Sequence, residues 1–179
     1  MAHTSPLKKS LFLKGSALMG IAYDSPRTTT DIDLTTSLEA DKEAVNQVRA
    51  LLDGAFPQII VRPGYAGLLL KVHSVTLRPK KRFDTAEFPA IKLKVGYADQ
   101  GTAAHEALIE GWAATAIEVD ISFNEPQTEP RIPAIPGGAE LLACSFTDLI
   151  AEKPRAMPQQ VVRRRNRRQD VYDPRVQRA

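Results

Sequence analysis

The chain has 179 residues, of which 43% are hydrophobic and 25% charged, and these values predict one soluble domain over residues 1–179 with a core of its own. No apolar run reaches the roughly 18 residues that a membrane span needs, and the single cysteine, Cys144, excludes an intramolecular disulfide and favours a reducing, cytoplasmic location. The net charge of +3 is uneven, since residues 153–179 contain nine Lys and Arg residues against two acids, and such a basic segment suggests a polyanionic partner.

The first patterned stretch of the chain covers residues 11–35. Its composition predicts a short apolar strand over residues 11–13, a turn at Gly15 and Ser16, and one or two helical turns over residues 17–23. A glycine lets the backbone approach a ligand, and a helix N-terminus offers free N–H groups to a phosphate. Gly15 and Ser16 are therefore candidate phosphate-binding residues.

The same stretch ends in a predicted strand that carries Asp31 and Asp33. Residues two apart on a strand share a face, so the two carboxylates project side by side while Ile32 and Leu34 enter the core. Adjacent carboxylates repel each other unless a cation lies between them, and hard oxygen ligands suit Mg²⁺ or Mn²⁺. A metal here and a phosphate near the turn would together bind a nucleoside triphosphate. The alternative is a pair of exposed acids on an edge strand.

Hydrophobic periodicity further along the chain predicts alternating helices and strands. A helix is expected over residues 37–53, with Ser37 as N-cap, a stop at Gly54 and a new start after Pro57. The other expected elements are strands over residues 58–62, 68–77, 90–97 and 117–123, a short helix over residues 105–110, a loop over residues 126–138, a strand over residues 140–144, and a helix from residue 145, with Ser145 or Thr147 as cap. This order predicts an α/β or α+β fold.

The predicted strand IEVDISF, residues 117–123, alternates apolar and polar side chains. Glu118, Asp120 and Ser122 share one face of the strand, and the four apolar residues share the other. Two more carboxylates are thus candidates to join Asp31 and Asp33.

These motifs resemble those of a known family. KGSAL at residues 14–18, followed by Arg27, Thr29, Asp31 and Asp33 in the pattern RxTxDID, resembles the AbiEii/AbiGii-type toxins of the nucleotidyltransferase superfamily. The resemblance implies a small mixed β-sheet flanked by helices. It also implies that the glycine and serine of KGSAL, with the arginine and threonine of RxTxDID, bind the nucleotide.

The resemblance also implies a third metal ligand. In the nucleotidyltransferase fold a carboxylate on a neighbouring strand joins the first pair, and Asp120 holds the corresponding position, with Glu118 as the less favoured choice. The implied metal ligands are Asp31, Asp33 and Asp120, and the implied reaction is the transfer of NMP from an NTP to an acceptor hydroxyl, assisted by Mg²⁺ or Mn²⁺.

A second resemblance to the same family covers residues 146–173, FTDLIAEK…VVRRRNRRQDVYD. Glu152 and Lys153 match a Glu-Lys pair, and Asp170 falls in the acidic step that follows the arginine-rich stretch. The resemblance gives Lys153 the role of neutralising triphosphate charge. Asp170 would either accept the proton of the attacking hydroxyl or orient Lys153. The family resemblance implies a continuous helix after Lys153, and Pro154 and Pro158 depart from that pattern. Each proline inside a helix costs about 3 kcal/mol, so the helix that carries Lys153 is expected to be interrupted.

The basic cluster of the C-terminal segment fits an RNA acceptor on electrostatic grounds. It consists of Arg163, Arg164, Arg165, Arg167 and Arg168. By resemblance, the acceptor is RNA, such as the 3′ end of tRNA, and the protein is the toxin of a toxin–antitoxin or phage-defence system with a cognate antitoxin as partner. The alternatives are a nucleotidyltransferase that acts on a small molecule and a catalytically degenerate relative that binds RNA or another protein.

Other catalytic classes lack their motifs in this sequence. The three histidines share no ligand spacing with one another or with Cys144, which argues against a zinc site. No GxxxxGK[ST] loop is present, which argues against a P-loop enzyme.

Overall fold

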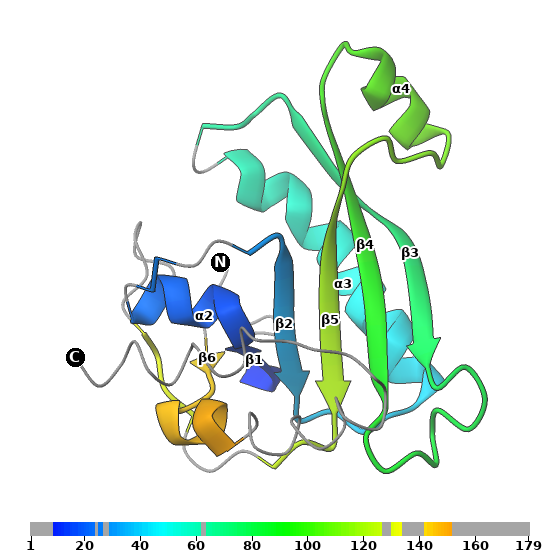
Figure 1. Cartoon of the computed structure of the whole chain (residues 1–179). Helices are drawn as coiled ribbons and strands as arrows, with labels where there is room; N and C mark the ends of the chain where they lie inside the picture. Colours follow the sequence, from blue (N-terminus) through cyan, green and yellow to red (C-terminus); the bar gives the residue numbers. More distant parts are fainter. Residues whose placement is uncertain are drawn as a thin grey trace, which may run out of the picture.

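The computed structural model describes most of the first 151 residues of the chain. The described residues are 9–23, 25–26, 29–61, 64–126, 130–133 and 142–151. In chain order the elements are β1 (Leu11–Lys14), α2 (Gly15–Ala22), β2 (Asp31–Thr36), α3 (Lys42–Val61), β3 (Leu68–Arg78), β4 (Ala90–Asp99), α4 (Ala103–Ile109), β5 (Ala116–Phe123) and β6 (Leu142–Ala143) (Figure 1). Residues 146–151 form one more helical segment.

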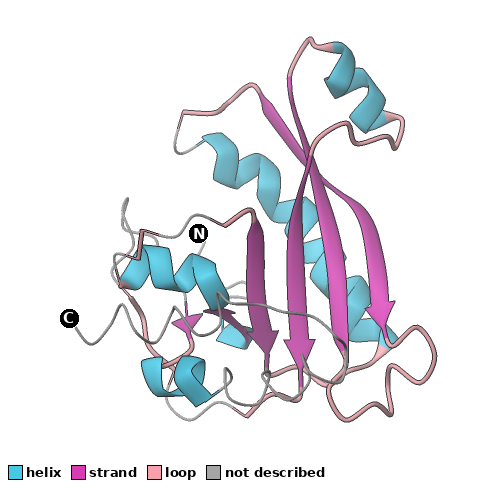
Figure 2. Ribbon diagram, in the orientation of Figure 1, coloured by secondary structure: helices cyan, strands magenta, loops and turns pink. Residues whose placement is uncertain are grey.

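The strands form one six-stranded mixed sheet in the order β3-β4-β5-β2-β1-β6 (Figure 2). β2 pairs with β5 and β1 pairs with β6 in parallel, and the other neighbouring strands are antiparallel. Helices flank this sheet, so the predicted class, a mixed β-sheet flanked by helices, is confirmed. The order places β5 beside β2 although β3, β4 and two helices separate them in the chain.

The main core lies between α3 and the sheet. Figure 1 shows α3 running behind β3, β4 and β5. Val48 of α3 packs in one cluster with Ile91 and Leu93 of β4 and with Ile121 and Phe123 of β5, and all five side chains are fully buried. The apolar half of each alternating strand therefore faces α3, and this leaves the polar half of β5 on the opposite face.

A second apolar cluster holds α2 and the edge of the sheet together. It contains Phe12 and Leu13 of β1, Leu18 of α2, Ala143 of β6, and Leu149. The helical segment that carries Leu149 begins with a reciprocal cap, since the Ser145 hydroxyl accepts a bond from the Asp148 backbone N–H at 3.1 Å and donates to the Asp148 carboxylate at 2.9 Å. Ser145 is thus the cap of this helix.

The predicted boundaries of the first long helix were wrong at both ends. α3 begins at Lys42, and Asp41 rather than Ser37 caps it, because the Asp41 carboxylate accepts the Ala44 backbone N–H at 2.5 Å. The helix continues through Gly54 and Pro57 to Val61, so no strand forms over residues 58–61.

Packing explains why α3 continues. Leu51, Leu52 and Phe56 are half-buried and pack against the main core. This apolar face lies partly in the second half of the helix, and its burial outweighs the low helix propensity of glycine and proline.

Candidate active site

Asp31 and Asp33 lie on β2, as predicted, and share one face of the strand. Ile32 and Leu34, which alternate with them, pack against both apolar clusters. Asp31 is exposed and Asp33 is half-buried. The apolar neighbours therefore fix which way the strand faces, and the two acids occupy its polar side.

The parallel pairing of β2 with β5 brings one acid of each strand together. Asp33 is the register partner of Asp120, and Asp31 is the register partner of Glu118. Neighbouring strands lie about 4.8 Å apart, so the α-carbons of Asp33 and Asp120 are adjacent. The next partners in this row are Lys14 on β1 and Lys92 on β4. The acidic pair thus has a lysine position on each side of it.

The backbone of Gly15 packs directly against Asp33. Gly15 has a φ of +66°, and an added Cβ would lie 2.9 Å from both the Cβ and the Cγ of Asp33 and closer still to its Oδ2. Only glycine meets both conditions, the left-handed backbone and the close approach. α2 begins at this residue, and Ser16 in its first turn is buried. The predicted Gly15–Ser16 turn therefore adjoins the acidic pair.

Thr29 lies two residues before β2, and its hydroxyl contacts the backbone of the first residue of the strand. Its hydroxyl lies 3.3 Å from both the backbone N and the backbone O of Asp31, and accepts the N–H. Thr30 donates to the Asp31 carboxylate at 3.4 Å. These contacts orient Asp31 at the exposed end of the strand.

The carboxylate pair suits a magnesium or manganese ion by donor type. Mg²⁺ is usually bound by one or two carboxylates together with substrate phosphates and water, rather than by a cage of protein ligands. Across the described ranges, no three Asp, Glu, His or Cys side chains form a group that could hold a metal ion. The structure thus pairs Asp33 with Asp120 by register, and Asp31 lies two residues from Asp33 on the same face of β2.

A family model for the "Nucleotidyl transferase AbiEii toxin, Type IV TA system" matches residues 1–175. The chain belongs to the AbiEii family. A search of the curated proteins found no match to this AbiEii-family chain.

Among the solved structures that this chain matches is MenT4, a nucleotidyltransferase toxin from Mycobacterium tuberculosis H37Rv. The match has 20% identity and a TM-score of 0.47, and it covers 81% of this chain and 44% of that one. JHP933 from Helicobacter pylori has 16% identity and a TM-score of 0.46 over 82% of this chain and 49% of that one. A putative nucleotidyltransferase from H. pylori has 17% identity and a TM-score of 0.45 over 82% of this chain and 51% of that one. The AbiEii-family chain therefore spans about half the length of these proteins.

The second acid of β5, Glu118, is engaged by lysines. Its carboxylate forms an ion pair with Lys92 and lies 3.8 Å from the Nζ of Lys94. The hydrogen bond from Lys92 and the nearby positive charges of Lys92, Lys94 and Arg78 lower the pKa of Glu118 from its ordinary value of 4.5. In this AbiEii-family chain, Glu118 thus belongs to an ion-pair cluster with β4, and Asp120 is the acid that β5 presents beside Asp33.

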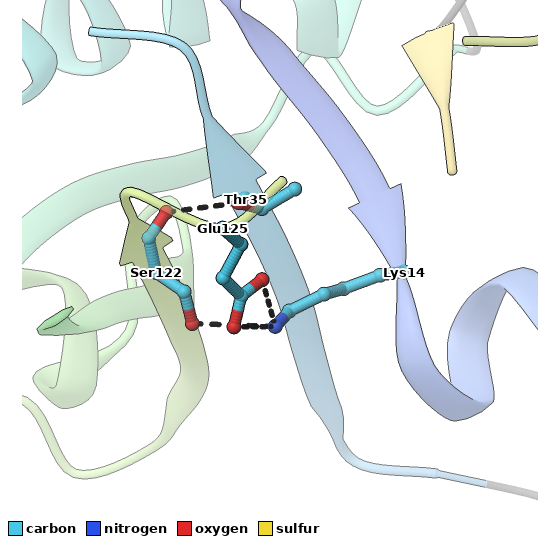
Figure 3. A network of polar contacts seen from close by, with 4 residues as sticks. All are labelled: Lys14, Thr35, Ser122 and Glu125. Atoms are coloured by element: carbon cyan, nitrogen blue, oxygen red, sulfur yellow. Dashed lines mark hydrogen bonds and ion pairs between the residues drawn. The ribbon is translucent and has the colours of Figure 1, made fainter. Parts of the chain in front are cut away.

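Lys14 is a charged residue of this region that the sequence patterns did not single out. It is only 7% exposed, and its ammonium binds Glu125 at 2.6 and 2.8 Å and the Ser122 hydroxyl at 3.3 Å (Figure 3). Thr35 adds a bond from its hydroxyl to the Ser122 carbonyl at 3.1 Å. The sequence feature that could have identified Lys14 is its position as the one charged residue at the end of an apolar strand.

Several predicted site residues of the AbiEii-family chain lie outside the described residues. They are Arg27, Lys153, Asp170, Arg163, Arg164, Arg165, Arg167 and Arg168. Pro154 and Pro158 also lie outside them. Among the helices that the structure describes, none is both long and apolar enough to span a membrane.

Proposed function

We propose that this chain is a metal-dependent nucleotidyltransferase that transfers NMP from an NTP to an acceptor hydroxyl. The observation that supports this most strongly is the pairing of Asp33 with Asp120 beside the backbone of Gly15. A phosphate-binding turn and two adjacent carboxylates are what binding of a triphosphate with its metal ion requires. Membership of the AbiEii family supports the same reaction.

Each element of the site has a proposed role. Asp33 and Asp120 would hold Mg²⁺ or Mn²⁺, with Asp31 as a further ligand at the exposed end of β2. When bound, the metal would neutralise phosphate charge and favour ionisation of the acceptor hydroxyl. The free backbone N–H groups at Gly15 and Ser16 would bind the phosphates, since they lie in the first turn of α2.

The residues outside the described ranges complete the proposal. Arg27 and Lys153 would neutralise the charge of the triphosphate as pyrophosphate leaves. Asp170 would accept the proton of the attacking hydroxyl or orient Lys153. Thr29 would act indirectly, because its hydroxyl holds the backbone of Asp31.

For the acceptor we propose RNA, with the 3′ end of tRNA as the specific candidate. The support is the arginine cluster over residues 163–168, since phosphate contacts dominate protein affinity for nucleic acids. The family description, a toxin of a type IV system, supports a role as a toxin with a cognate antitoxin as its partner. For its location we propose the cytoplasm, since a single cysteine is typical of a reducing compartment.

A nucleotide titration with and without Mg²⁺ tests the metal site. Wild type should bind NTP in a Mg²⁺-dependent manner, and Asp33→Asn and Asp120→Asn should each abolish that dependence. Asp31→Asn should have a smaller effect, because Asp31 is exposed and lies beside Glu118 rather than Asp120. Absence of binding to folded wild-type protein would contradict the proposal and favour a degenerate relative.

Labelled NTPs incubated with the protein, Mg²⁺ and total tRNA test the acceptor. Label should enter the RNA, and the double variant Arg163→Ala/Arg165→Ala should reduce incorporation without changing NTP affinity. Unchanged turnover of this variant would favour a small-molecule acceptor. Label that stays entirely unincorporated would count against RNA as the acceptor.

A further inference from the structure

Lys14 places a buried positive charge at the end of an otherwise apolar strand. The other three residues of β1 are buried and apolar, and Lys14 is 7% exposed. Both oxygens of Glu125 contact its ammonium, at 2.6 and 2.8 Å, and the Ser122 hydroxyl lies at 3.3 Å. The ammonium is therefore held by an acid and a hydroxyl at the end of β5 (Figure 3).

Stability alone does not explain this ion pair. Removing two charges from water carries a desolvation penalty that their mutual attraction often fails to offset, and well-packed apolar residues in place of a buried pair are often neutral or stabilising. After Leu11, Phe12 and Leu13, an apolar residue at position 14 would continue the strand. A lysine here indicates a role in the neighbouring site.

The position of Lys14 indicates what that role is. Its backbone directly precedes Gly15, and its register partner on β2 is Asp33. Its side chain crosses β2 and ends at Ser122, two residues beyond Asp120 on the same face of β5. One side chain thus links the phosphate-binding turn to the strand that carries the second acid, across the strand that carries the first.

The acidic end of this link is itself anchored. Asn124, which follows β5 and precedes Glu125, has a left-handed backbone with a φ of +59°. This residue turns the chain at the end of the strand. The Phe123 backbone N–H donates to the Pro89 carbonyl at 2.8 Å, and the Asn124 amide donates to the Glu87 carbonyl at 3.4 Å. Glu125 is therefore presented from a turn that is tied to the start of β4.

We infer that the Lys14–Glu125 ion pair is a positioning device that holds the Gly15–Ser16 turn against Asp33 and Asp120 in the geometry that nucleotide phosphates require. Neither residue touches the nucleotide; both act through the backbone of the turn and of β5. The inference rests on the proposed nucleotide-binding function. It adds Lys14, Glu125 and Ser122 to the residues on which that function depends.

The decisive variant replaces the whole pair, Lys14→Met with Glu125→Leu. Its thermal midpoint should stay close to that of wild type, since both charges of the Lys14–Glu125 ion pair are removed together. Its Mg²⁺-dependent affinity for NTP should fall by about 10- to 100-fold, the usual effect of removing a supporting contact. Arg49→Met, which removes an exposed cation of α3, is the control and should leave that affinity unchanged.

The single variant Glu125→Gln distinguishes a positioning role of Lys14 from direct binding of phosphate by its ammonium. If the double variant does not fold, this single variant tests the inference by itself. A positioning role predicts weaker NTP binding, because the amide holds the ammonium less firmly. Direct binding of phosphate by Lys14 predicts tighter binding, because the ammonium is released. Tighter binding, or wild-type affinity in the folded double variant, would overturn the inference. Absence of binding in wild type would instead refute the proposed function.

Discussion

At the scale of single residues, the contact between Gly15 and Asp33 is the most constrained feature of the site. The backbone of Gly15 is left-handed, and the carboxylate of Asp33 occupies the space that a Cβ would need. A larger residue must therefore displace the acid that we propose as a metal ligand. This position couples the proposed phosphate-binding turn to the acidic pair through direct contact.

We expect Gly15→Ala to impair both stability and nucleotide binding. The left-handed backbone alone should cost about 1–2 kcal/mol, and the collision with Asp33 should add to this and weaken Mg²⁺-dependent binding. Gly101→Ala is the matched control, because Gly101 has a φ of +78° with nothing within 4 Å of an added Cβ. Urea unfolding and nucleotide titration of both variants measure the difference. Equal losses in the two variants would contradict a special role for Gly15.

At the scale of elements, α3 shows where sequence patterns gave the wrong boundaries. Gly54 and Pro57 were interpreted as the end of the helix, yet the helix passes through both. Local helix propensity is a weak guide here, because the apolar residues before and after Gly54 pack against the same core and keep the helix continuous. The alternating strands were predicted well because a period of two depends only on neighbouring residues.

Gly54→Ala tests the extension of α3. An added Cβ at Gly54 meets nothing within 4 Å, and alanine inside a helix is favoured over glycine by roughly 0.5–1 kcal/mol. The free energy of unfolding should rise by that amount in urea denaturation. A variant that is no more stable than wild type would contradict a continuous helix at this position.

The ion pairs between β4 and β5 predict a pH dependence. The pKa of Glu118 is lowered, mainly by the hydrogen bond from Lys92, so this pair stabilises the fold above the ordinary pKa of 4.5 and the stabilisation disappears as pH falls through the lowered value. Lys92→Met should raise the pKa of Glu118 and flatten the loss of stability on acidification.

Carboxyl NMR titration and urea unfolding across this pH range measure both effects. Lys94→Met is the comparison and should have a weaker effect, because Lys94 lies farther from the carboxylate, at 3.8 Å. A larger shift in the Lys94 variant would contradict the assignment of Lys92 as the main partner.

At the scale of the whole molecule, the register between β2 and β5 was beyond prediction from sequence. The sequence patterns placed four acids on two strands, namely Asp31, Asp33, Glu118 and Asp120. They did not predict that Asp33 pairs with Asp120. Register between strands so far apart in the chain depends on how α3 and the intervening hairpin pack, which local patterns do not encode. The family resemblance supplied the choice of Asp120 over Glu118.

The sheet order also predicts a gradient of amide exchange. β5 pairs with β4 on one side and β2 on the other, and α3 covers its apolar face. Its amides and those of β4 should exchange most slowly, whereas the two-residue edge strand β6 should exchange fastest. Native-state hydrogen exchange checks this order. Fast exchange in β5 would contradict its central place.

The same central place of β5 has a consequence for biosynthesis. A ribosome-bound chain that has emerged only as far as β4 carries Asp33 and the Gly15 turn but lacks the strand that joins β4 to β2. Because a domain generally folds as a unit, Asp33 and Asp120 can pair only after β5 has been synthesised and inserted between β4 and β2. We therefore expect the proposed activity to be absent from short nascent chains and from a truncated product that ends before residue 116.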